Sequence, residues 1–229
     1  MADDNKTART RGYGLGSVDS VMSVDAVEEA ASQIAQKPSV DKLRKLVNGE
    51  PLLEIHDLIA GYGRMEILHG MDLLVGKGQS LCLIGPNGAG KSTVLHSIFG
   101  FTHIMSGQIL KQGQNITRMT PEQKLRQTGV AYILQDNSVF PDMTVTENLL
   151  MGGYLLPDQH QVRSAVEFEI LARLQQEEGK TIIMVEQNAK KGLEFADIGY
   201  VLVSGQLALV GTGNDLLQQP EVGKLFLGG

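Results

Sequence analysis

The chain has 229 residues, of which 42% are hydrophobic and 20% charged, enough for one α/β domain with a buried core plus an appendage, and too few for two full domains. Twenty Lys and Arg against 26 Asp and Glu give a formal net charge of −6, so no global basic field exists to hold nucleic acid. The single cysteine, Cys82, excludes an intramolecular disulfide and a cysteine-rich metal site, and its apolar surroundings predict a packing role. No run approaches the ~18 apolar residues of a membrane span and the start MADDNK does not resemble a signal peptide, so we expect a cytosolic chain.

The first 49 residues form a separate N-terminal extension in this interpretation. We expect residues 1–20 to be disordered. Helical spacing predicts one short amphipathic helix over residues 23–36 and a second one through Val40, Leu43 and Val47. Their apolar sides would pack on the main domain or on another protein. A weakly ordered tail is the alternative, because helices this short are marginal alone.

Residues 50–229 form the main domain. From Pro51 the sequence reads as short strands broken by glycine turns, in LLEIHDLIAGYG and ILHGMDLLVGKGQSLCLIG. After residue 90 helices and strands alternate, as is typical of an α/β fold. The expected later elements are a helix in KSTVLHSIFG, a helix capped by Thr120 with Pro121 in its first position, a buried strand at 130–134, a capping box of Thr144 and Glu147, a helix at 161–178 ended by Gly179, a buried strand at 181–185, a helix at 189–196, a hairpin turning at Ser204 and Gly205, and short helices near Leu216 and Leu225.

The strongest motif is GPNGAGKST, which begins at Gly85 and matches G-x-x-x-x-G-K-[ST] between an apolar strand and an amphipathic helix. Its three glycines permit the backbone angles that turn successive N–H groups toward phosphate oxygens. Lys91 would supply the charge for the β- and γ-phosphates, and Ser92 would place its hydroxyl on Mg²⁺. A chance glycine-rich turn is the alternative. The expected nucleotide-binding residues of the loop are Gly85, Pro86, Asn87, Gly88, Ala89, Gly90, Lys91, Ser92 and Thr93.

Together with the preceding LEIHDLIAGYGRMEILHGMDLLVGKGQ, this loop resembles the ATP-binding cassettes of ABC transporters. The segments AYILQDNSVFPDMTVTENLLMGG and VEQNAKKGLEFADIGYVLVSGQLALVGTGNDLL resemble the branched-chain amino-acid subfamily in particular. The resemblance implies an α/β P-loop NTPase fold with an antiparallel N-terminal β part and a parallel core sheet that is truncated here. ATP and Mg²⁺ are the implied cofactors.

The same resemblance implies further site residues. Tyr62 stands at the place of an aromatic residue that stacks on adenine, with an exposed turn tyrosine as the alternative. Gln135 would reach Mg²⁺ or the attacking water, with a polar strand terminus as the alternative. Gln187 takes the place of the family's switch histidine near the γ-phosphate.

Two parts of such a cassette are missing from the sequence. No LSGGQ-type signature is present, and no aspartate follows four consecutive apolar residues as a Walker B motif requires. VSGQ at 203–206 imitates a signature but sits between two strand-like runs, and TIIMVE, ending at Glu186, imitates a Walker B strand but aligns with the switch strand. We expect an internal deletion with its junction near Glu167 and Phe168. The strands at 130–134 and 181–185 would then pair directly, in one right-handed crossover.

The function implied is an ATP-binding subunit of an importer for branched-chain amino acids, working at the inner face of the plasma membrane with permease subunits and a second ATP-binding subunit, in a homo- or heterodimer. A degenerate module that binds nucleotide or a permease without turnover is the alternative. A P-loop kinase is disfavoured by VEQNAKKGLEFAD. We expect hydrolysis to be defective, with Glu186 as the one possible replacement base.

Overall fold

The computed structural model describes residues 37–133, 142–144, 147, 173–186 and 188–226. The predictions for residues 1–36, for Leu134 and for most of the helix at 161–178 lie outside the described residues. The helices and strands are α2 Val40–Leu46, β1 Pro51–Tyr62, β2 Met65–Gly76, β3 Ser80–Ile84, α3 Lys91–Phe99, β4 His103–Lys111, β5 Gln114–Asn115, α4 Pro121–Gln123 with the π-helix η1 Lys124–Thr128, β6 Ile182–Val185, α7 Ala189–Phe195, β7 Ile198–Val203, β8 Gln206–Thr212, α8 Gly213–Gln218 and α9 Pro220–Phe226.

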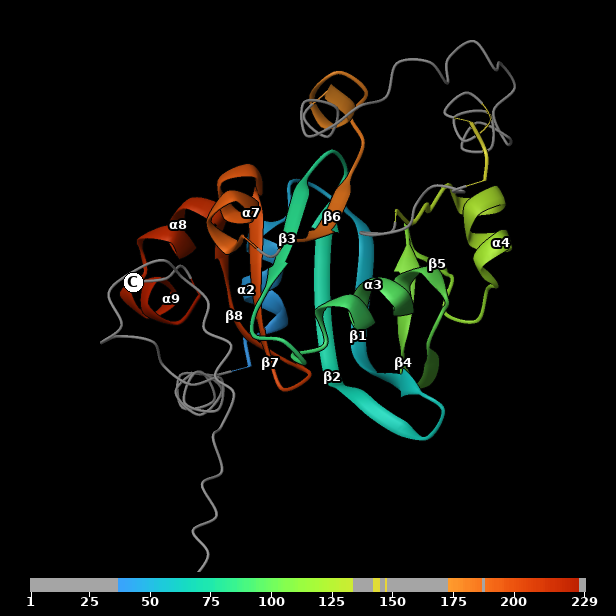
Figure 1. The fold of residues 1–229 in the computed structure, drawn as a ribbon, viewed down its shortest axis with the longest axis horizontal. Coiled ribbons are helices and arrows are strands. Elements are labelled where there is room, and N and C mark those ends of the chain that lie inside the picture. The colour runs from blue at the N-terminus through green and yellow to red at the C-terminus, as the bar shows by residue number, and fades with distance from the viewer. Residues whose placement is uncertain (1–36, 134–141, 145–146, 148–172, 187, 227–229) are drawn as a thin grey trace, which may run out of the picture.

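Two four-stranded sheets make up the described fold. One is antiparallel with strand order β2-β1-β4-β5, and the other is mixed with order β6-β3-β7-β8. In the mixed sheet, β3 is parallel to both β6 and β7, while β7 and β8 form a hairpin. Figure 1 shows α3 across β1 of the antiparallel sheet, α7 to α9 beside β7 and β8, and α4 beside β4 and β5. The predicted class, an antiparallel β part followed by a short parallel core, is confirmed.

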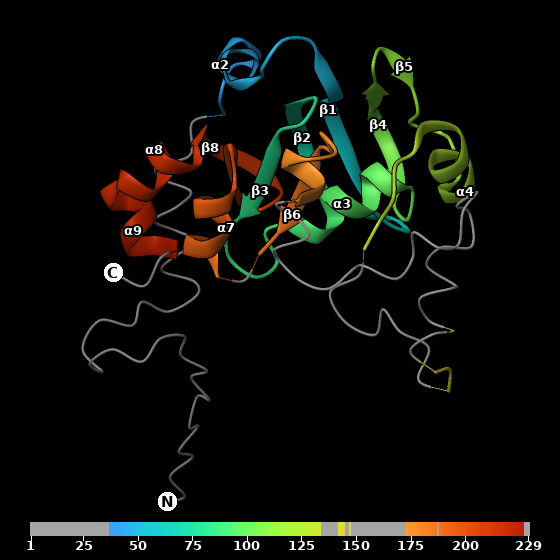
Figure 2. The ribbon, with the colours of Figure 1, turned by 90° about the horizontal axis from the view of Figure 1, so that it is seen from above.

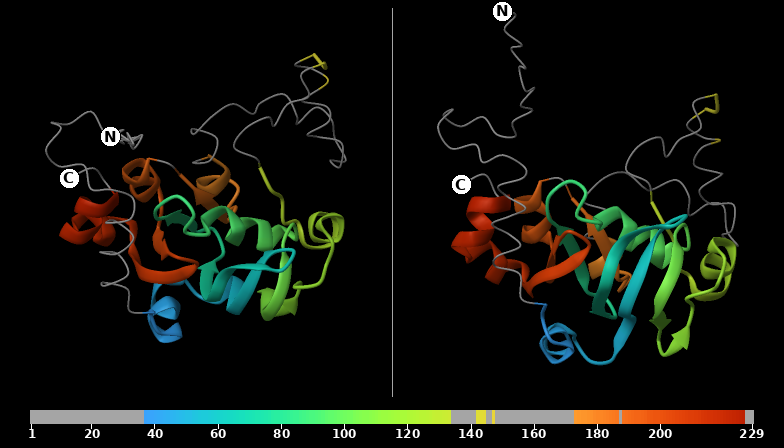
Figure 3. Two further views of the ribbon diagram at one scale, coloured as in Figure 1. Left: turned by 60° about the horizontal axis from the view of Figure 1, so that its bottom comes forward. Right: turned by 90° about the horizontal axis from the view of Figure 1, so that it is seen from below.

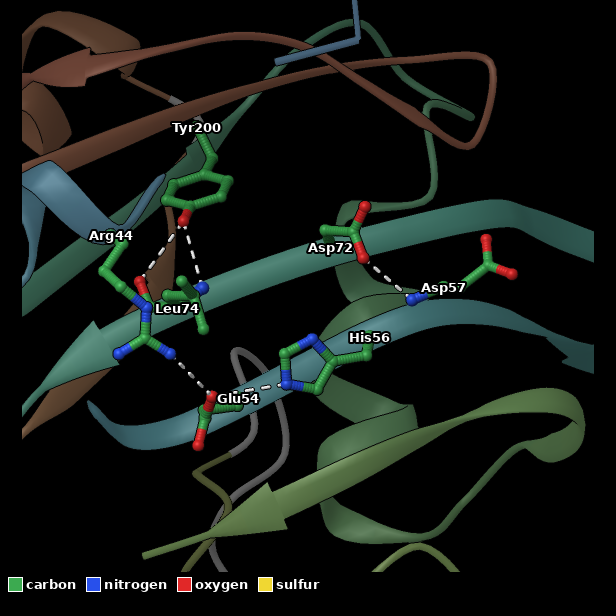
Figure 4. A network of polar contacts seen from close by, with 7 residues as sticks. All are labelled: Arg44, Glu54, His56, Asp57, Asp72, Leu74 and Tyr200. Atoms are coloured by element: carbon green, nitrogen blue, oxygen red, sulfur yellow. Dashed lines mark hydrogen bonds and ion pairs between the residues drawn. The ribbon is translucent and has the colours of Figure 1, made fainter. Parts of the chain in front are cut away.

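One apolar core joins the sheets. It contains Ile55 and Leu73 of the antiparallel sheet together with Leu83 and Tyr200 of the mixed one, all fully buried. The Tyr200 hydroxyl crosses between the sheets, donating to the Leu74 carbonyl at 3.2 Å and accepting from the Leu74 amide at 3.1 Å (Figure 4). Pairing the hydroxyl in this way avoids the cost of burying an unsatisfied polar group.

The second predicted helix of the extension is α2, and its partner is the main domain. Ser39 caps its N-terminus by accepting a hydrogen bond from the Lys42 amide at 3.3 Å, and Leu43 is fully buried in the shared core. Arg44 forms an ion pair with Glu54 of β1 at 3.6 Å (Figure 4). Figures 2 and 3 place α2 on the opposite side of the sheets from α3. The ordered part of the extension therefore belongs to the fold's core and lies away from the phosphate loop.

The buried strand predicted at 130–134 is wrong for its described residues. Residues 130–133 contain no strand, and Ile133 is 77% exposed. The amide of Val130 donates to the Lys124 carbonyl at 3.2 Å, and the Tyr132 ring packs on side chains of α3, which holds the segment beside that helix. The predicted direct pairing with the strand at 181–185 is therefore wrong as well.

That second strand exists as β6, but it is half-buried rather than buried. Within the described residues β6 pairs with β3 alone, so its other side has no strand neighbour there. From Pro51 the structure has two strands of 12 residues each, β1 and β2, in place of the short strands expected there, whereas several other predicted elements are present. Residues 173–176 are helical before Gly179, Thr120 and Thr144 make their capping boxes, and Ser204 and Gly205 turn the hairpin with φ values of 46° and 76°.

Candidate functional site

The phosphate loop connects the end of β3 to the start of α3. Strand β3 pairs with β6 and β7 on its two sides, and its five residues are buried, with Leu83 in one apolar cluster and Cys82 in another, so the loop leaves a rigid base. Gly85, Gly88 and Gly90 have φ values of 146°, 86° and 94°, which disfavour any residue with a Cβ. At Gly85 a Cβ atom would also lie 2.2 Å from the Leu202 carbonyl oxygen of β7, so glycine is required there by space as well.

Lys91 is the first residue of α3, and its side chain folds back over the loop. Its Nζ donates to the carbonyl oxygens of Gly85 and Pro86, each at 2.8 Å. Burial lowers the pKa of Lys91. Within the described part of the chain, no carboxylate oxygen lies within ion-pair distance of this ammonium group. A partly buried cation balanced only by carbonyl dipoles is suited to an anionic partner such as a phosphate.

The other predicted loop residues divide by exposure. Asn87, Gly88 and Ser92 are exposed, so they are accessible to a ligand at the loop. Ala89 and Thr93 are buried, and they serve the packing of α3 on the sheets. Ser92, in the first turn of α3, therefore presents the accessible hydroxyl next to Lys91, as expected for a residue that contributes to a hydrated Mg²⁺.

The phosphate loop is hydrogen-bonded to the turn between β7 and β8, which the sequence predicted only as an ordinary hairpin turn. Gly205, at the tip of the β7–β8 hairpin, donates its amide to the Ala89 carbonyl at 3.1 Å and accepts the His69 amide of β2 at 3.0 Å. A Cβ at Gly205 would lie 1.9 Å from the Ile67 carbonyl oxygen. The turn thus fixes the loop to both sheets. The Ser-Gly pair predicted a turn, but nothing local to it indicated this contact.

Tyr62 is the last residue of β1, and the residue is 44% exposed. Its hydroxyl lies 2.5 Å from Nδ1 of His96, which is on α3 five residues after Lys91, about 7.5 Å along the helix axis. The structure therefore connects Tyr62 to the helix that carries Lys91. His96 was not among the predicted site residues.

Lys124 contacts the C-terminal end of α3. It is fully buried, and its Nζ donates to the carbonyl oxygens of Ser97 at 3.3 Å and Ile98 at 2.8 Å. These are carbonyls of the last turn of α3, where the helix dipole favours a cation. Burial lowers the pKa of Lys124 to about 8.

Gln135 and Gln187 lie outside the described residues. Glu186 directly follows β6, and because Leu83 pairs with Val185, it lies level with the last residue before the phosphate loop. Its side chain packs against Gly192 of α7, and its Oε1 accepts the Asn188 amide at 2.8 Å. The structure thus brings Glu186 to the same edge of the sheet as the loop, but seats its side chain against α7.

Two further observations bound the chemistry of the site. Burial raises the pKa of the Cys82 thiol to about 12, in keeping with its predicted packing role. In the described ranges, no group of three or more His, Cys, Asp and Glu side chains is arranged to hold a metal ion. Among the described residues, Ser92 is the predicted ligand for a Mg²⁺ at this loop, and an ion held there would take its other ligands largely from water and phosphate oxygens, as is usual for Mg²⁺.

Comparison with known families matches residues 68–219, which include the phosphate loop, both flanking elements and the β7–β8 hairpin, to the ABC transporter family. The chain belongs to the ABC transporter family. This agrees with the resemblance in the sequence and with the order of the mixed sheet. Members of this family bind ATP through such cassettes, and Mg²⁺ is usual for their ATPases.

Curated relatives narrow the resemblance. The chain is 29% identical over 235 residues to the probable branched-chain amino acid transport ATP-binding protein LivF of Archaeoglobus fulgidus, covering 77% of this chain and 99% of that protein. It is 29% identical over 224 residues to the high-affinity branched-chain amino acid transport ATP-binding protein BraG of Pseudomonas aeruginosa, covering 73% and 96%. The alignment with LivF spans 235 positions but uses only 77% of the 229 residues of this chain. LivF therefore has residues within the aligned region that this chain lacks.

Solved structures agree on the fold. A nucleotide-free ATP-binding cassette from an ABC transporter matches with a TM-score of 0.58 at 18% identity, over 79% of this chain and all of that one. CbiO1 of Clostridium perfringens, part of the ABC transporter complex cbiONQ, matches with a TM-score of 0.63 at 19% identity, over 76% and 93%. None of the helices in the described ranges is long and apolar enough to span a membrane. ATP-binding subunits of ABC importers work with membrane permease components, and neither relative supports the alternative of a module without turnover.

Proposed function

We propose that this protein is the ATP-binding subunit of an ABC importer for branched-chain amino acids. The observation that carries the proposal is the Lys91 ammonium, which is partly buried over a glycine loop and, among the described residues, is hydrogen-bonded only to the carbonyls of Gly85 and Pro86. In this proposal the β- and γ-phosphates of ATP replace those carbonyl contacts. The substrate class rests on the LivF and BraG relatives.

The remaining site residues have distinct roles in this proposal. Tyr62 stacks on the adenine, Ser92 and Gln135 contribute to the Mg²⁺ shell, and Gln187 lies near the γ-phosphate. Residues 50–229 form the nucleotide-binding domain and 1–49 an extension, of which α2 packs on that domain. The protein acts at the cytoplasmic face of the plasma membrane, with permease subunits and a second ATP-binding subunit, and without nucleic acid.

Calorimetric titration of ATP·Mg²⁺ tests the proposal. Charge-assisted hydrogen bonds to phosphate contribute about 1.5–3 kcal/mol each, so we expect Lys91→Ala to weaken binding by about 10- to 150-fold. Lys77→Ala is the matched control, because Lys77 is an exposed lysine in the turn before β3, at the strand end away from the loop. Equal affinity of Lys91→Ala and the parent would overturn the assignment of the loop as the nucleotide site.

The transported substrate class needs a separate measurement. The proposal predicts that the purified chain binds the permease subunits of its importer, and that these permease subunits, assembled with a complete ATP-binding subunit, support leucine, isoleucine or valine uptake into vesicles loaded with ATP. Uptake of none of these, by vesicles in which ATP binding is intact, would contradict the substrate class while leaving the nucleotide site in place.

A further inference from the structure

His96 lies at the centre of a cluster of aromatic side chains at the C-terminal part of α3. Its ring makes edge-on contacts with Tyr62 of β1, Phe101 before β4, and Tyr132, with ring-centroid distances of 6.1, 5.8 and 5.5 Å. Phe99 completes the cluster through Phe101 and Tyr132. One imidazole therefore connects the strand end that carries Tyr62, the phosphate-loop helix, and the segment that leads to Gln135.

The contact between His96 and Tyr62 is polar as well as aromatic. The Tyr62 hydroxyl lies 2.5 Å from His96 Nδ1, within hydrogen-bond distance. Burial lowers the pKa of His96, which favours the neutral imidazole. In the neutral ring with its proton on Nε2, Nδ1 accepts the hydrogen bond that the Tyr62 hydroxyl donates. The two residues are 34 positions apart, so the bond fixes the end of β1 to α3.

The geometry leaves Tyr62 free for a second contact. The planes of the two rings are 81° apart, so His96 meets Tyr62 edge-on and does not stack on its face. Tyr62 keeps 44% of its surface exposed although its hydroxyl is bound. A tyrosine whose hydroxyl is held while the residue stays exposed is a preorganised platform for a planar group.

We propose that His96 is a positioning residue for nucleotide recognition, which holds the Tyr62 ring in the orientation that stacks on the base. This rests on the proposed function and adds to it a determinant of affinity for the base that is separate from the phosphate contacts of Lys91. Without the hydrogen bond, the Tyr62 side chain must be ordered when the base binds. Immobilising one such side chain weakens affinity by about 2- to 10-fold.

A structural role for the aromatic cluster is the competing explanation, and substitution at the hydrogen bond separates the two. His96→Phe keeps an aromatic ring in the cluster but removes the acceptor. His96→Asn removes the ring but places an amide oxygen near the position of Nδ1. Tyr62→Phe removes only the hydroxyl. If His96 acts through Tyr62, the first and third changes remove the same interaction, and their effects in the double variant will not add.

The experiment measures the affinity of the full chain for ATP·Mg²⁺ and for inorganic triphosphate with Mg²⁺, by calorimetry. We expect His96→Phe to weaken ATP binding by about 2- to 10-fold with triphosphate binding unchanged, Tyr62→Phe to do the same, the double variant to be no weaker than either, and His96→Asn to restore part of the ATP affinity. His56→Phe is the matched control, because His56 lies on the same strand as Tyr62 and binds Glu54 instead.

The outcomes separate this inference from the proposed function. If the parent does not bind ATP, or binds it as well with Lys91→Ala, the proposed function fails. If the parent binds through Lys91 but His96→Phe leaves ATP affinity intact, the positioning role is overturned. It is equally overturned if His96→Phe weakens ATP and triphosphate alike, if the two changes add fully, or if His96→Asn is no better than His96→Phe.

Discussion

The side-chain contacts at the two ends of α3 differ in how far apart the partners lie in the sequence. At the N-terminal end, Lys91 bonds the carbonyls of Gly85 and Pro86, six and five residues away, and the glycines set the backbone between them. At the C-terminal part, His96 meets Tyr62 across 34 residues, and Lys124 reaches back 26 residues to Ile98. The contacts of Lys91 thus lie within one short motif, with Gly205 of the distant β7–β8 turn holding the loop, whereas the aromatic end exists only because the sheets bring distant segments to the helix.

The largest expected effect concerns what the phosphate end lacks. A general base contributes about 10²- to 10⁴-fold to a rate and fixed electrostatic stabilisation about 10²- to 10³-fold, and the sequence contains no recognisable Walker B carboxylates or signature. We therefore expect phosphate release by the purified chain, with its permease present, to be indistinguishable from that of Lys91→Ala. Turnover near that of a complete cassette, abolished by Glu186→Gln, would contradict this and make Glu186 the base.

A second change probes the rigidity of the phosphate end. Gly85→Ala would place a Cβ 2.2 Å from the Leu202 carbonyl, in a backbone conformation with φ at 146°. We expect a loss of roughly 3 kcal/mol in the free energy of unfolding, measured with urea. Gly88→Ala is the matched control, since its φ is 86° but, among the described residues beyond its chain neighbours, no atom lies within 4 Å of its Cβ, so about 1–2 kcal/mol of backbone strain is expected. Equal losses would mean that the contact with β7 does not confine the loop.

We expect the aromatic end of α3 to determine the affinity for the base of ATP and not the affinity for its phosphates. Tyr62→Ala removes the stacking surface, so we expect ATP affinity to fall by about 1–3 kcal/mol with little change for inorganic triphosphate. Lys91→Ala should weaken both ligands, which makes it the opposite control. Equal weakening of both ligands by Tyr62→Ala would show that Tyr62 acts through the fold and that the two ends of α3 are not separate determinants.

The smallest effect expected, counted per pH unit, is a pH dependence of stability at Lys124. Its pKa in the folded chain is about 8 against an ordinary 10.5, so between these values the unfolded state binds more protons than the folded state, and stability rises with pH. The cost of the buried charge is fully present below about pH 8. We expect the parent to gain stability relative to Lys124→Met by roughly 1 kcal/mol per pH unit across this window, by urea unfolding. A pH-independent difference would show that Lys124 does not titrate there.

Sequence reasoning predicted the backbone of the phosphate end well, because most determinants of that backbone are local. GPNGAGKST specifies the glycine turns, the start of α3 and the placing of Lys91 without reference to the rest of the chain. It predicted Tyr62 by resemblance, but not His96, because a histidine on a helix carries no signal until the strand that will meet it is known. The same limit explains the wrong strand at 130–134. Its apolar run has the composition of a buried strand, yet Tyr132 packs on α3 and Ile133 is exposed.

The position of β3 in the middle of its sheet bears on how the chain is made. Ser80 pairs with Ile182 and Leu81 with Ile198, so both neighbours of β3 are synthesised long after it. Chains emerge from the ribosome N-terminal end first, at about 5–20 residues per second, so the phosphate-loop strand waits for several seconds without its partners. The β1–β2 hairpin can form meanwhile, because its strands are adjacent. The entropic cost of closing a loop falls by about 0.6 kcal/mol each time the length of the loop is halved. A shortened connection between β3 and β6 therefore makes this late pairing more favourable.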